Sequence, residues 1–395
     1  MKKIFILCLC FLLLCCPLSV FAENKPNVRA QGAVLMDGET GRVLWGKNED
    51  TPLAMASTTK IMTAILVLEE GKLDDMVKVS SNAANTAKVR MNLSVNEEIR
   101  LEDLLYAMML KSYNDAAVAI AEHMSGSVEA FCQRMTEKAQ EIGAMDTVFG
   151  SPNGLDSTLP FQKHHSTARD MALIASYALK NPEFVKLVNT QHVEIPMKGG
   201  KGKHYSVDNA NRFLKMYDGA CGVKTGYTNK AGQCFVGAAK RGDRTFVTAV
   251  LGSGWGTEGK EQKWKDTKAL MDYGFENFTK EIVLSQGTKM GDAKIKNSPT
   301  TMVSGYAKED CILLVSQEQM QKIQYQIQQN EEMDAPITKG QVLGKVTLWL
   351  DGEQVGETEI LSAESAPKFT LMQRMKKLGK DWVEFEISKE IPFLQ

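Results

Sequence analysis

The chain has 395 residues, with 47 Lys and Arg residues against 48 Asp and Glu residues and a hydrophobic fraction of 43%. This composition is typical of a folded protein, excludes a disordered or fibrous chain, and at this length predicts two or more domains. The near-zero net charge argues against a nucleic-acid-binding protein, which normally carries a basic surplus. Five histidines without a His-Glu-x-x-His pattern argue against a metal site, and we expect them at the surface or in loops.

The first 22 residues predict export. Lys2 and Lys3 precede an apolar run at residues 4–14, and Val20-Phe21-Ala22 ends the segment. This is the order of a signal peptide, with a charged region, a hydrophobic region and a small-residue cleavage site after Ala22. The alternative is an uncleaved membrane anchor, although the apolar run is short for a spanning helix. We therefore expect the protein to act outside the cytoplasm, on the outer face of the membrane or in the cell wall.

The cysteines are divided between this segment and the rest of the chain. Four of the eight lie in the signal segment (Cys8, Cys10, Cys15 and Cys16), and four follow it (Cys132, Cys221, Cys234 and Cys311). Export permits disulfides, but no Cys-x-x-Cys spacing and no dense framework is present. We expect isolated buried thiols. A disulfide between Cys221 and Cys234 is the one pairing left open, because these residues flank a predicted hairpin.

Residues 23–279 predict a layered α/β domain whose sheet is built from both ends of the segment. A β-hairpin is expected first, with strands at 33–36 and 42–45 joined by turn residues 37–41. Helices are expected at 58–70, 101–142 and 168–179; strands at 222–227, 233–239 and 245–251; and a last helix at 263–278. The helix at 58–70 is apolar on most sides, which predicts that it is buried.

Residues 280–365 predict a small all-β domain. Ile323, Tyr325 and Ile327 alternate with glutamines, which is the period of a half-buried strand. Two further apolar segments, at 346–350 and 358–361, lie on either side of Asp351-Gly352, a hairpin signal.

Residues 366–395 predict a basic amphipathic tail. Apolar residues recur at spacings of three or four and basic residues lie between them: Leu371, Met375, Leu378, Trp382 and Phe385, with Arg374, Lys376, Lys377 and Lys380. Such a helix suits a membrane surface, and the alternative is a helix docked on its own domain.

The first motif that carries chemistry is Ser57-Thr58-Thr59-Lys60, at the start of the buried helix. A spacing of three places the Ser57 hydroxyl and the Lys60 ammonium on one helical face. Serine is a poor nucleophile until a base removes its proton, and a lysine in an apolar helix can have its pKa lowered enough to act as that base. Alone the motif is weak evidence for catalysis, because a helix-capping serine followed by a solvated lysine has the same spacing.

The second motif is Ser112-Tyr113-Asn114, between two predicted helices. Here Ser112 could relay a proton and Asn114 could hold a substrate amide, although a helix-capping turn explains the motif equally well.

The third motif is Lys224-Thr225-Gly226, on a predicted strand. Gly226 would allow a substrate backbone to approach, Lys224 would supply positive charge and Thr225 a hydroxyl, whereas the structural alternative is an edge-strand lysine before a turn.

The three motifs occur in the order and spacing of penicillin-recognising serine enzymes. The chain resembles the low-molecular-mass penicillin-binding proteins that are serine-type D-alanyl-D-alanine carboxypeptidases. The resemblance covers nearly the whole mature chain and extends to other segments: Lys224-Thr225-Gly226-Tyr227-Thr228, Ala231-Gly232, Ser166-Thr167-Ala168-Arg169-Asp170 and Asn153-Gly154-Leu155. It implies a transpeptidase/β-lactamase-like α/β (α+β) domain at 23–279, followed by the β domain and the tail.

The resemblance implies a role for each motif residue. Ser57 would form an acyl-enzyme with the penultimate D-alanine of a peptidoglycan pentapeptide, Lys60 would be its base, and Ser112 would pass the proton to the departing D-alanine. Asn114 would position the peptide, Lys224 would stabilise charge, and Thr225 would bind the terminal carboxylate. The backbone N–H groups of Ser57 and Tyr227 would form the oxyanion hole. No metal or organic cofactor is implied, β-lactams would be covalent inhibitors, and cross-linking of the cell wall would be limited.

One position departs from the family. Relatives place an arginine ahead of the last helix of this domain to bind the substrate carboxylate, and this chain has Lys263 there. Lysine keeps the charge but loses the bidentate guanidinium.

Three alternative functions fit the sequence less well. A class A β-lactamase deacylates with the glutamate of a Glu-x-x-Leu-Asn pattern, which does not occur between Asn114 and Lys224, and has aspartate in place of Tyr113. A catalytically inactive cell-wall-binding protein of the same fold would have no need of the intact motifs. A Ser-His-Asp hydrolase would need a Gly-x-Ser-x-Gly elbow, which is absent.

Overall fold

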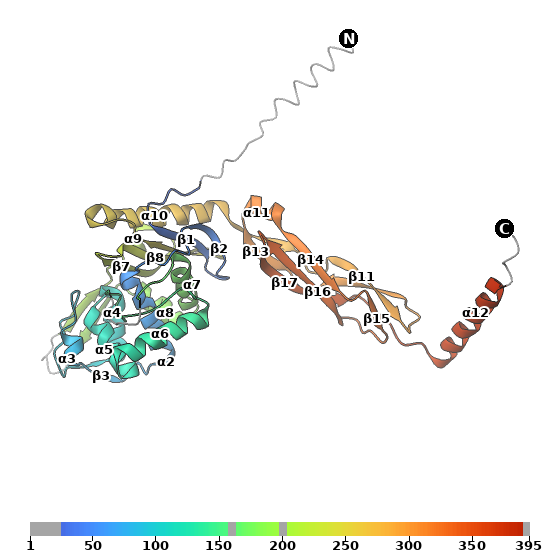
Figure 1. Cartoon of the computed structure of the whole chain (residues 1–395), viewed down its shortest axis with the longest axis horizontal. Coiled ribbons are helices and arrows are strands. Elements are labelled where there is room, and N and C mark those ends of the chain that lie inside the picture. Colours follow the sequence, from blue (N-terminus) through green and yellow to red (C-terminus); the bar gives the residue numbers. More distant parts are fainter. Residues whose placement is uncertain (1–24, 157–162, 197–203, 390–395) are drawn as a thin grey trace, which may run out of the picture. The chain divides into compact units, whose positions relative to one another are not determined.

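The computed structural model describes residues 25–156, 163–196 and 204–389, so the predicted signal peptide lies outside the described residues. Two compact units are formed (Figure 1). The first comprises Met1–Arg241 and Thr245–Gly274, and the second comprises Gly242–Arg244 and Phe275–Gln395. Each unit has its own hydrophobic core and is described by itself.

The first unit is built on a five-stranded sheet with the order β2-β1-β9-β8-β7. The strands are β1 (Gly32–Asp37), β2 (Val43–Lys47), β7 (Ala220–Thr228), β8 (Gly232–Arg241) and β9 (Arg244–Leu251). The first strand pairs antiparallel with the last, with Gly32 opposite Leu251. The prediction that both ends of this segment build one sheet is confirmed. β7 lies at one edge of the sheet and pairs with β8.

Helices cover both faces of this sheet (Figure 1). Most of them lie on one face: α2 (Lys60–Glu70), α4 (Leu101–Lys111), α5 (Asn114–Ser125), α6 (Val128–Ile142), α7 (Ala168–Ala178) and α8 (Pro182–Asn189). α10 (Gly256–Asn277) covers the other face. Because both faces of the sheet are covered, successive side chains of β1 pack alternately against the helices on one face and on the other. Val34 and Met36 belong to the core around α2, whereas a Cβ at Gly274 of α10 would meet Leu35 at 3.2 Å.

The predicted helices are confirmed, with one change of boundary. α2 is buried from Lys60 to Val67, as its apolar composition predicts. The last helix starts at Gly256 rather than at Lys263. Its first turns, Gly256 to Gln262, contain two glycines and polar residues and carry no apolar periodicity, so the sequence gives no helix signal there.

Several short elements were not predicted. They are β3 (Met76–Lys78), α3 (Ser81–Ala84), β4 (Glu98–Arg100), α8 (Pro182–Asn189), β5 (His192–Pro196), β6 (His204–Asp208), α9 (Phe213–Met216) and the 3₁₀ turn η1 (Ala56–Thr59). The four thiols of the described residues are free. Cys234 lies opposite Gly226 in the β7–β8 pair, so the register does not place it beside Cys221.

From Thr279 to Ser362 the second unit is β-structure apart from the short helix α11, which confirms the predicted all-β domain. A six-stranded sheet has the order β14-β16-β17-β12-β11-β15, and β10 pairs with β13. The elements are β10 (Thr279–Leu284), β11 (Lys289–Lys296), β12 (Met302–Ala307), β13 (Cys311–Val315), α11 (Gln317–Lys322), β14 (Gln324–Gln329), β15 (Glu332–Asp334), β16 (Val342–Leu350) and β17 (Glu353–Ser362). The hairpin predicted around Asp351-Gly352 joins β16 to β17.

The expectation of a half-buried strand at 323–327 is wrong in one respect. The strand exists as β14, but Tyr325 and Ile327 remain 49% and 47% exposed. β14 is the edge strand of its sheet, and its apolar face is therefore not covered as the face of a central strand would be.

The last element of the described residues is α12 (Leu371–Lys389). The apolar side chains of the predicted amphipathic stripe, Leu371, Met375, Leu378, Trp382 and Phe385, are all more than half exposed. Among the helices of the described residues, none is long and apolar enough to span a bilayer.

Candidate active site

The first motif forms a serine–lysine pair at the start of α2. Ser57 lies in the 3₁₀ turn η1, and Lys60 begins the α-helix that follows. The Lys60 Nζ donates a hydrogen bond to Ser57 Oγ at 3.0 Å. The predicted shared face is therefore realised, although the serine precedes the α-helix rather than belonging to it.

Lys60 is fully buried, and its surroundings favour the neutral amine. Burial lowers its pKa well below the ordinary value, the nearby positive charge of Lys224 lowers it further, and Asp115 opposes the shift. Burial of Lys60 excludes the alternative of a solvated lysine. Once Lys60 has lost one proton, its amine has a free lone pair within hydrogen-bond distance of the Ser57 hydroxyl and is able to accept the hydroxyl proton.

The second motif contributes an amide to this pair. Asn114 opens α5, and its Oδ1 accepts a hydrogen bond from Lys60 Nζ at 2.8 Å. The next residue, Asp115, is buried and accepts backbone hydrogen bonds from Met91 at 2.9 Å and Asn92 at 2.8 Å. Sequence analysis did not select Asp115, yet it ties α5 to the neighbouring loop and places a negative charge near Lys60.

Ser112 lies two residues before Asn114, between α4 and α5. Its φ of 64° is in the left-handed region, which non-glycine residues seldom adopt. Ala56, which precedes Ser57, also has a positive φ of 49°. Strained conformations of this kind are concentrated at functional sites. Here one occurs at Ser112 itself and the other at Ala56, the residue before Ser57.

A backbone carbonyl that the sequence did not reveal completes the environment of the pair. Asn153 O accepts a hydrogen bond from Lys60 Nζ at 2.5 Å and from Ser57 Oγ at 3.2 Å. The segment Asn153-Gly154-Leu155 had been noted only for its resemblance to the family. A main-chain acceptor carries no side-chain signature, so only the structure could identify this role.

His164 joins the segment of Asn153 to the segment of Ser57. It lies in a loop, as expected, but is buried. Its Nδ1 accepts from the Gly150 N–H at 3.1 Å, so Nε2 carries the proton and lies 3.1 Å from Thr59 Oγ1. Burial lowers the pKa of His164 to about 4, which keeps the ring neutral at pH 7.

The third motif lies on β7, alongside the turn that carries Ser57. A Cβ placed on Gly226 would lie 2.8 Å from Ser57 N, which is closer than a side chain tolerates. This position therefore requires glycine for the close approach of two backbones. Thr225 is half-buried beside it, whereas Tyr227 is largely exposed and its hydroxyl donates to Asn229 Oδ1 at 3.1 Å.

Two lysines place positive charge behind this strand. Burial, assisted by the charge of Lys263, lowers the pKa of Lys224 to about 7, and Lys224 Nζ donates to Thr225 O at 3.1 Å. Burial likewise lowers the pKa of Lys263 to about 8. Lys263 Nζ donates to Gln233 Oε1 at 2.7 Å on the neighbouring strand β8.

Lys263 lies inside α10 rather than ahead of it, because that helix starts earlier than the sequence indicated. Its hydrogen bond to Gln233, which lies opposite Tyr227 in the β7–β8 pair, places it close to the third motif. An ammonium group has three donors, and one of them is engaged by Gln233, so the others are able to serve a substrate carboxylate.

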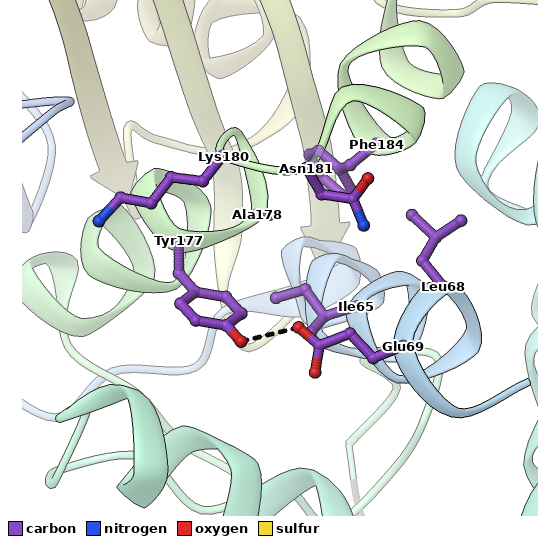
Figure 2. Close-up of a pocket in the computed structure, with 8 residues that line it drawn as sticks. All are labelled: Ile65, Leu68, Glu69, Tyr177, Ala178, Lys180, Asn181 and Phe184. Atoms are coloured by element: carbon purple, nitrogen blue, oxygen red, sulfur yellow. Dashed lines mark hydrogen bonds between the residues drawn. The ribbon is translucent and has the colours of Figure 1, made fainter.

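A separate pocket of about 240 Å³ contains none of the predicted site residues (Figure 2). It is lined mainly by apolar side chains of α2, α7 and α8, including Ile65, Leu68 and Phe184. Two of its polar groups are engaged with each other, because Tyr177 Oη donates to Glu69 Oε1 at 2.8 Å. We assign this pocket no part in the chemistry.

The arrangement is suited to nucleophilic attack by a serine on a carbonyl group. A base contacts the nucleophile, an amide and a carbonyl fix the base, and positive charge lies nearby for an anionic substrate. Across residues 25–156, 163–196 and 204–389, no group of three or more His, Cys, Asp or Glu side chains could hold a metal ion.

Comparison with known families gives two matches. The family described as D-alanyl-D-alanine carboxypeptidase matches residues 19–254. The family described as penicillin-binding protein 5, C-terminal domain, matches residues 278–368. The predicted penicillin-recognising fold followed by an all-β domain is confirmed by these matches.

Individual relatives agree with this result. D-alanyl-D-alanine carboxypeptidase DacF of Bacillus subtilis (strain 168) is 33% identical over 363 residues, which cover 90% of this chain and 91% of the relative. The crystal structure of penicillin binding protein 5 from Haemophilus influenzae has a TM-score of 0.67 at 28% identity, covering 87% of this chain and 99% of that one. A mutant of the Streptomyces K15 DD-transpeptidase has a TM-score of 0.57 at 34% identity, covering 64% and 100%.

Proposed function

The chain belongs to the D-alanyl-D-alanine carboxypeptidase family and is a serine-type carboxypeptidase, and we propose that Ser57 removes the terminal D-alanine from peptidoglycan pentapeptides. The hydrogen bond of 3.0 Å between fully buried Lys60 and Ser57 Oγ carries this proposal. It unites a nucleophile with a base whose pKa is lowered by burial.

In the first step, Ser57 Oγ attacks the carbonyl carbon between the two terminal D-alanines while the Lys60 amine takes its proton. The negative charge that develops on the carbonyl oxygen faces the backbone N–H groups of Ser57 and Tyr227. The close approach of Gly226 to Ser57 N supports this placement, since it brings β7 against the turn that carries the nucleophile.

Collapse of the intermediate breaks the peptide bond. The proton held by Lys60 passes through Ser112 to the nitrogen of the departing D-alanine, and the acyl group stays on Ser57. Asn114 positions the peptide and holds Lys60. Water then hydrolyses the ester, which restores Ser57 and releases a shortened peptide that is no longer a donor for cross-linking.

The terminal carboxylate of the substrate is bound by positive charge and a hydroxyl. Lys224, Thr225 and Lys263 are the candidates, and both lysines are buried close to the third motif. The edge strand β7 also offers backbone groups with which an extended peptide can pair as an added strand.

Location and inhibition complete the proposal. The predicted signal peptide supports export, and the exposed apolar stripe and basic residues of α12 support binding to the outer face of the membrane. β-Lactams mimic the terminal dipeptide, so we expect them to acylate Ser57. Without a Glu-x-x-Leu-Asn glutamate to activate water, the adduct should persist rather than turn over as in a class A β-lactamase.

Release of free D-alanine from a soluble pentapeptide tests the reaction, and intact mass after β-lactam treatment tests the nucleophile. Ser57→Ala should abolish both. Lys60→Ala should slow acylation by about 10²–10⁴-fold, the usual contribution of a general base, while the nucleophile remains. An adduct on a residue other than Ser57, or rapid hydrolysis of the β-lactam, would contradict the assignment.

The similarity to a DD-transpeptidase raises transfer of the acyl group to an amine as a second outcome. The two outcomes share the acyl-enzyme and differ in the acceptor. Adding an amine acceptor to the assay separates them, because hydrolysis gives only the shortened peptide and transfer gives an acceptor-linked product.

A further inference from the structure

A second pocket, of about 440 Å³, lies at the start of α10, and its lining mixes polar and apolar groups. Its lining includes one exposed aromatic ring and several hydrogen-bonding side chains: Trp255, Arg29, Gln31, Ser253, Glu258 and Gln262. The volume is within the ordinary range of about 300–1,000 Å³ for small-molecule sites. None of these residues belongs to the proposed catalytic machinery.

Trp255 is held as a rigid platform at this pocket. Its Nε1 donates to Asn229 O at 2.8 Å, which fixes the polar edge of the indole, yet 46% of the residue is exposed. Gly232, which has a φ of +67°, lies beside the ring, and a Cβ there would meet Trp255 Cε2 at 3.2 Å. An exposed indole that is already ordered can stack with a flat apolar face at a small cost in conformational entropy.

The remaining side chains offer both donors and acceptors. Arg29 Nη1 contacts Glu258 Oε1 at 2.7 Å in an exposed ion pair, and the Gln262 amide donates to Asp266 Oδ1 at 2.8 Å. Ser253 is buried, and its Oγ has no hydrogen-bond partner within the described part of the chain. Paired charges, amides and a hydroxyl suit a neutral ligand with many hydroxyl groups better than an anion or a cation.

We propose that this pocket binds a sugar ring of the glycan strand to which the substrate peptide is attached. The C–H face of a pyranose ring stacks on Trp255, and its hydroxyl and acetamido groups bond to the polar wall. This inference rests on the proposed function and deepens it, because it assigns a site to the carbohydrate part of the substrate.

The distance to the nucleophile is compatible with one substrate occupying both sites. Trp255 is bonded to Asn229, and Asn229 lies three residues beyond Gly226, which contacts Ser57. At about 3.3 Å per residue these three residues span about 10 Å. The attacked bond follows the fourth residue of the peptide, and four extended residues reach about 13 Å from the sugar.

The experiment compares D-alanine release from a disaccharide-pentapeptide and from the same pentapeptide without sugar. Trp255→Ala should lower kcat/KM about three- to tenfold for the sugar-linked substrate, as expected for loss of one ring-stacking contact. The sugar-free peptide should change less than twofold. Trp255→Phe keeps the apolar face and loses the Nε1 donor, so it should retain the preference for the sugar-linked substrate.

The matched control is Trp349→Ala, a partly exposed tryptophan of the second unit whose Nε1 also donates, to Gln326 Oε1 at 3.1 Å. It should leave both substrates unchanged. If Trp255→Ala and Trp255→Phe weaken both substrates equally, Trp255 only positions the β7–β8 turn and the proposal is overturned. It is overturned as well if Trp255→Ala leaves both substrates unchanged.

A binding measurement separates this proposal from the proposed function. The peptide-free disaccharide is titrated into the Ser57→Ala variant by calorimetry, with and without Trp255→Ala. Binding that disappears with Trp255→Ala supports the pocket even if the wild-type protein releases no D-alanine from either substrate. Binding that is absent, or that survives Trp255→Ala, contradicts the pocket whatever the catalytic result.

Discussion

Gly226 and Ser57 are in backbone contact across two segments that are distant in sequence. A Cβ on Gly226 would come within 2.8 Å of Ser57 N and 3.0 Å of Thr58 N, and both of these atoms belong to the main chain. A main chain held by a buried helix cannot move aside as a flexible side chain can. The geometry of the nucleophile therefore depends on the absence of a side chain on the facing strand.

Gly226→Ala should consequently lower the rate of acylation by a β-lactam about 10²-fold, the effect expected when reacting groups are displaced by about 1 Å. The midpoint of thermal unfolding should fall as well, because the added Cβ overlaps buried main chain that cannot move aside. Gly356→Ala is a matched control, since a Cβ at that strand position meets its nearest neighbours only at 3.8 Å. Equal acylation rates in the two variants would contradict the role of Gly226.

The charge of Lys224 should set the pH at which Lys60 becomes an active base. Acylation requires neutral Lys60, so its rate rises as pH increases through the pKa of that group. Lys224 lowers this pKa, and removing its charge favours protonated Lys60. Lys224→Gln should therefore move the ascending limb of the acylation profile to higher pH, whereas Lys224→Arg should move it less. The quantity to measure is the pH at the midpoint of the ascending part of the profile, rather than the maximal rate. An unchanged midpoint would refute the effect of the Lys224 charge on the pKa of Lys60.

His164 should make the first unit less stable in acid. Its pKa of about 4 lies below the ordinary value of about 6.5, so the unfolded chain binds more protons between these limits. Stability is full at neutral pH and falls as pH decreases through this window, by about 2 kcal/mol between pH 7 and pH 5. Urea unfolding followed by near-UV circular dichroism should reveal this loss in the wild type and a smaller one in His164→Gln. Identical pH slopes in both proteins would exclude His164 as the source.

Lys263 should contribute to recognition of the substrate carboxylate. Losing one charge-assisted contact costs about 1.5–3 kcal/mol, so Lys263→Ala should lower kcat/KM for a pentapeptide by one to two orders of magnitude. Lys263→Arg should be tolerated or improve binding, because a guanidinium offers two parallel donors. The same peptide with a C-terminal amide is the control, and the effect should disappear with it. An undiminished effect on the amide would assign Lys263 to structure alone.

The C-terminal helix should be the membrane anchor. Its apolar stripe would insert at the interface, while Arg374, Lys376, Lys377 and Lys380 lie near anionic headgroups. Deleting residues 368–395 should abolish sedimentation with anionic vesicles and leave turnover of a soluble peptide nearly intact. A truncated protein that sediments as the full chain does would place the anchor elsewhere.

The sequence by itself determined the fold class, the order of the main elements and the three motifs. Strong periodicity made this possible: α2 is apolar on most sides, the strands of the first sheet lie between turn residues, and Asp351-Gly352 marks a hairpin. These are local signals that survive without tertiary contacts. The start of α10 was missed because its first turns contain glycine and polar residues without an apolar period.

Only the tertiary structure decided how the motifs combine. Ser57, Asn153 and Gly226 are brought together by packing of α2, a loop and an edge strand, and no sequence spacing records that packing. The role of the Asn153 carbonyl is carried by the main chain, which is the same at every residue and so leaves no compositional signal. The lowered pKa of Lys60 likewise arises from burial and from the charge of Lys224, a residue remote in the chain. Chemistry of this kind depends on distance and dielectric environment, and both are properties of the folded protein.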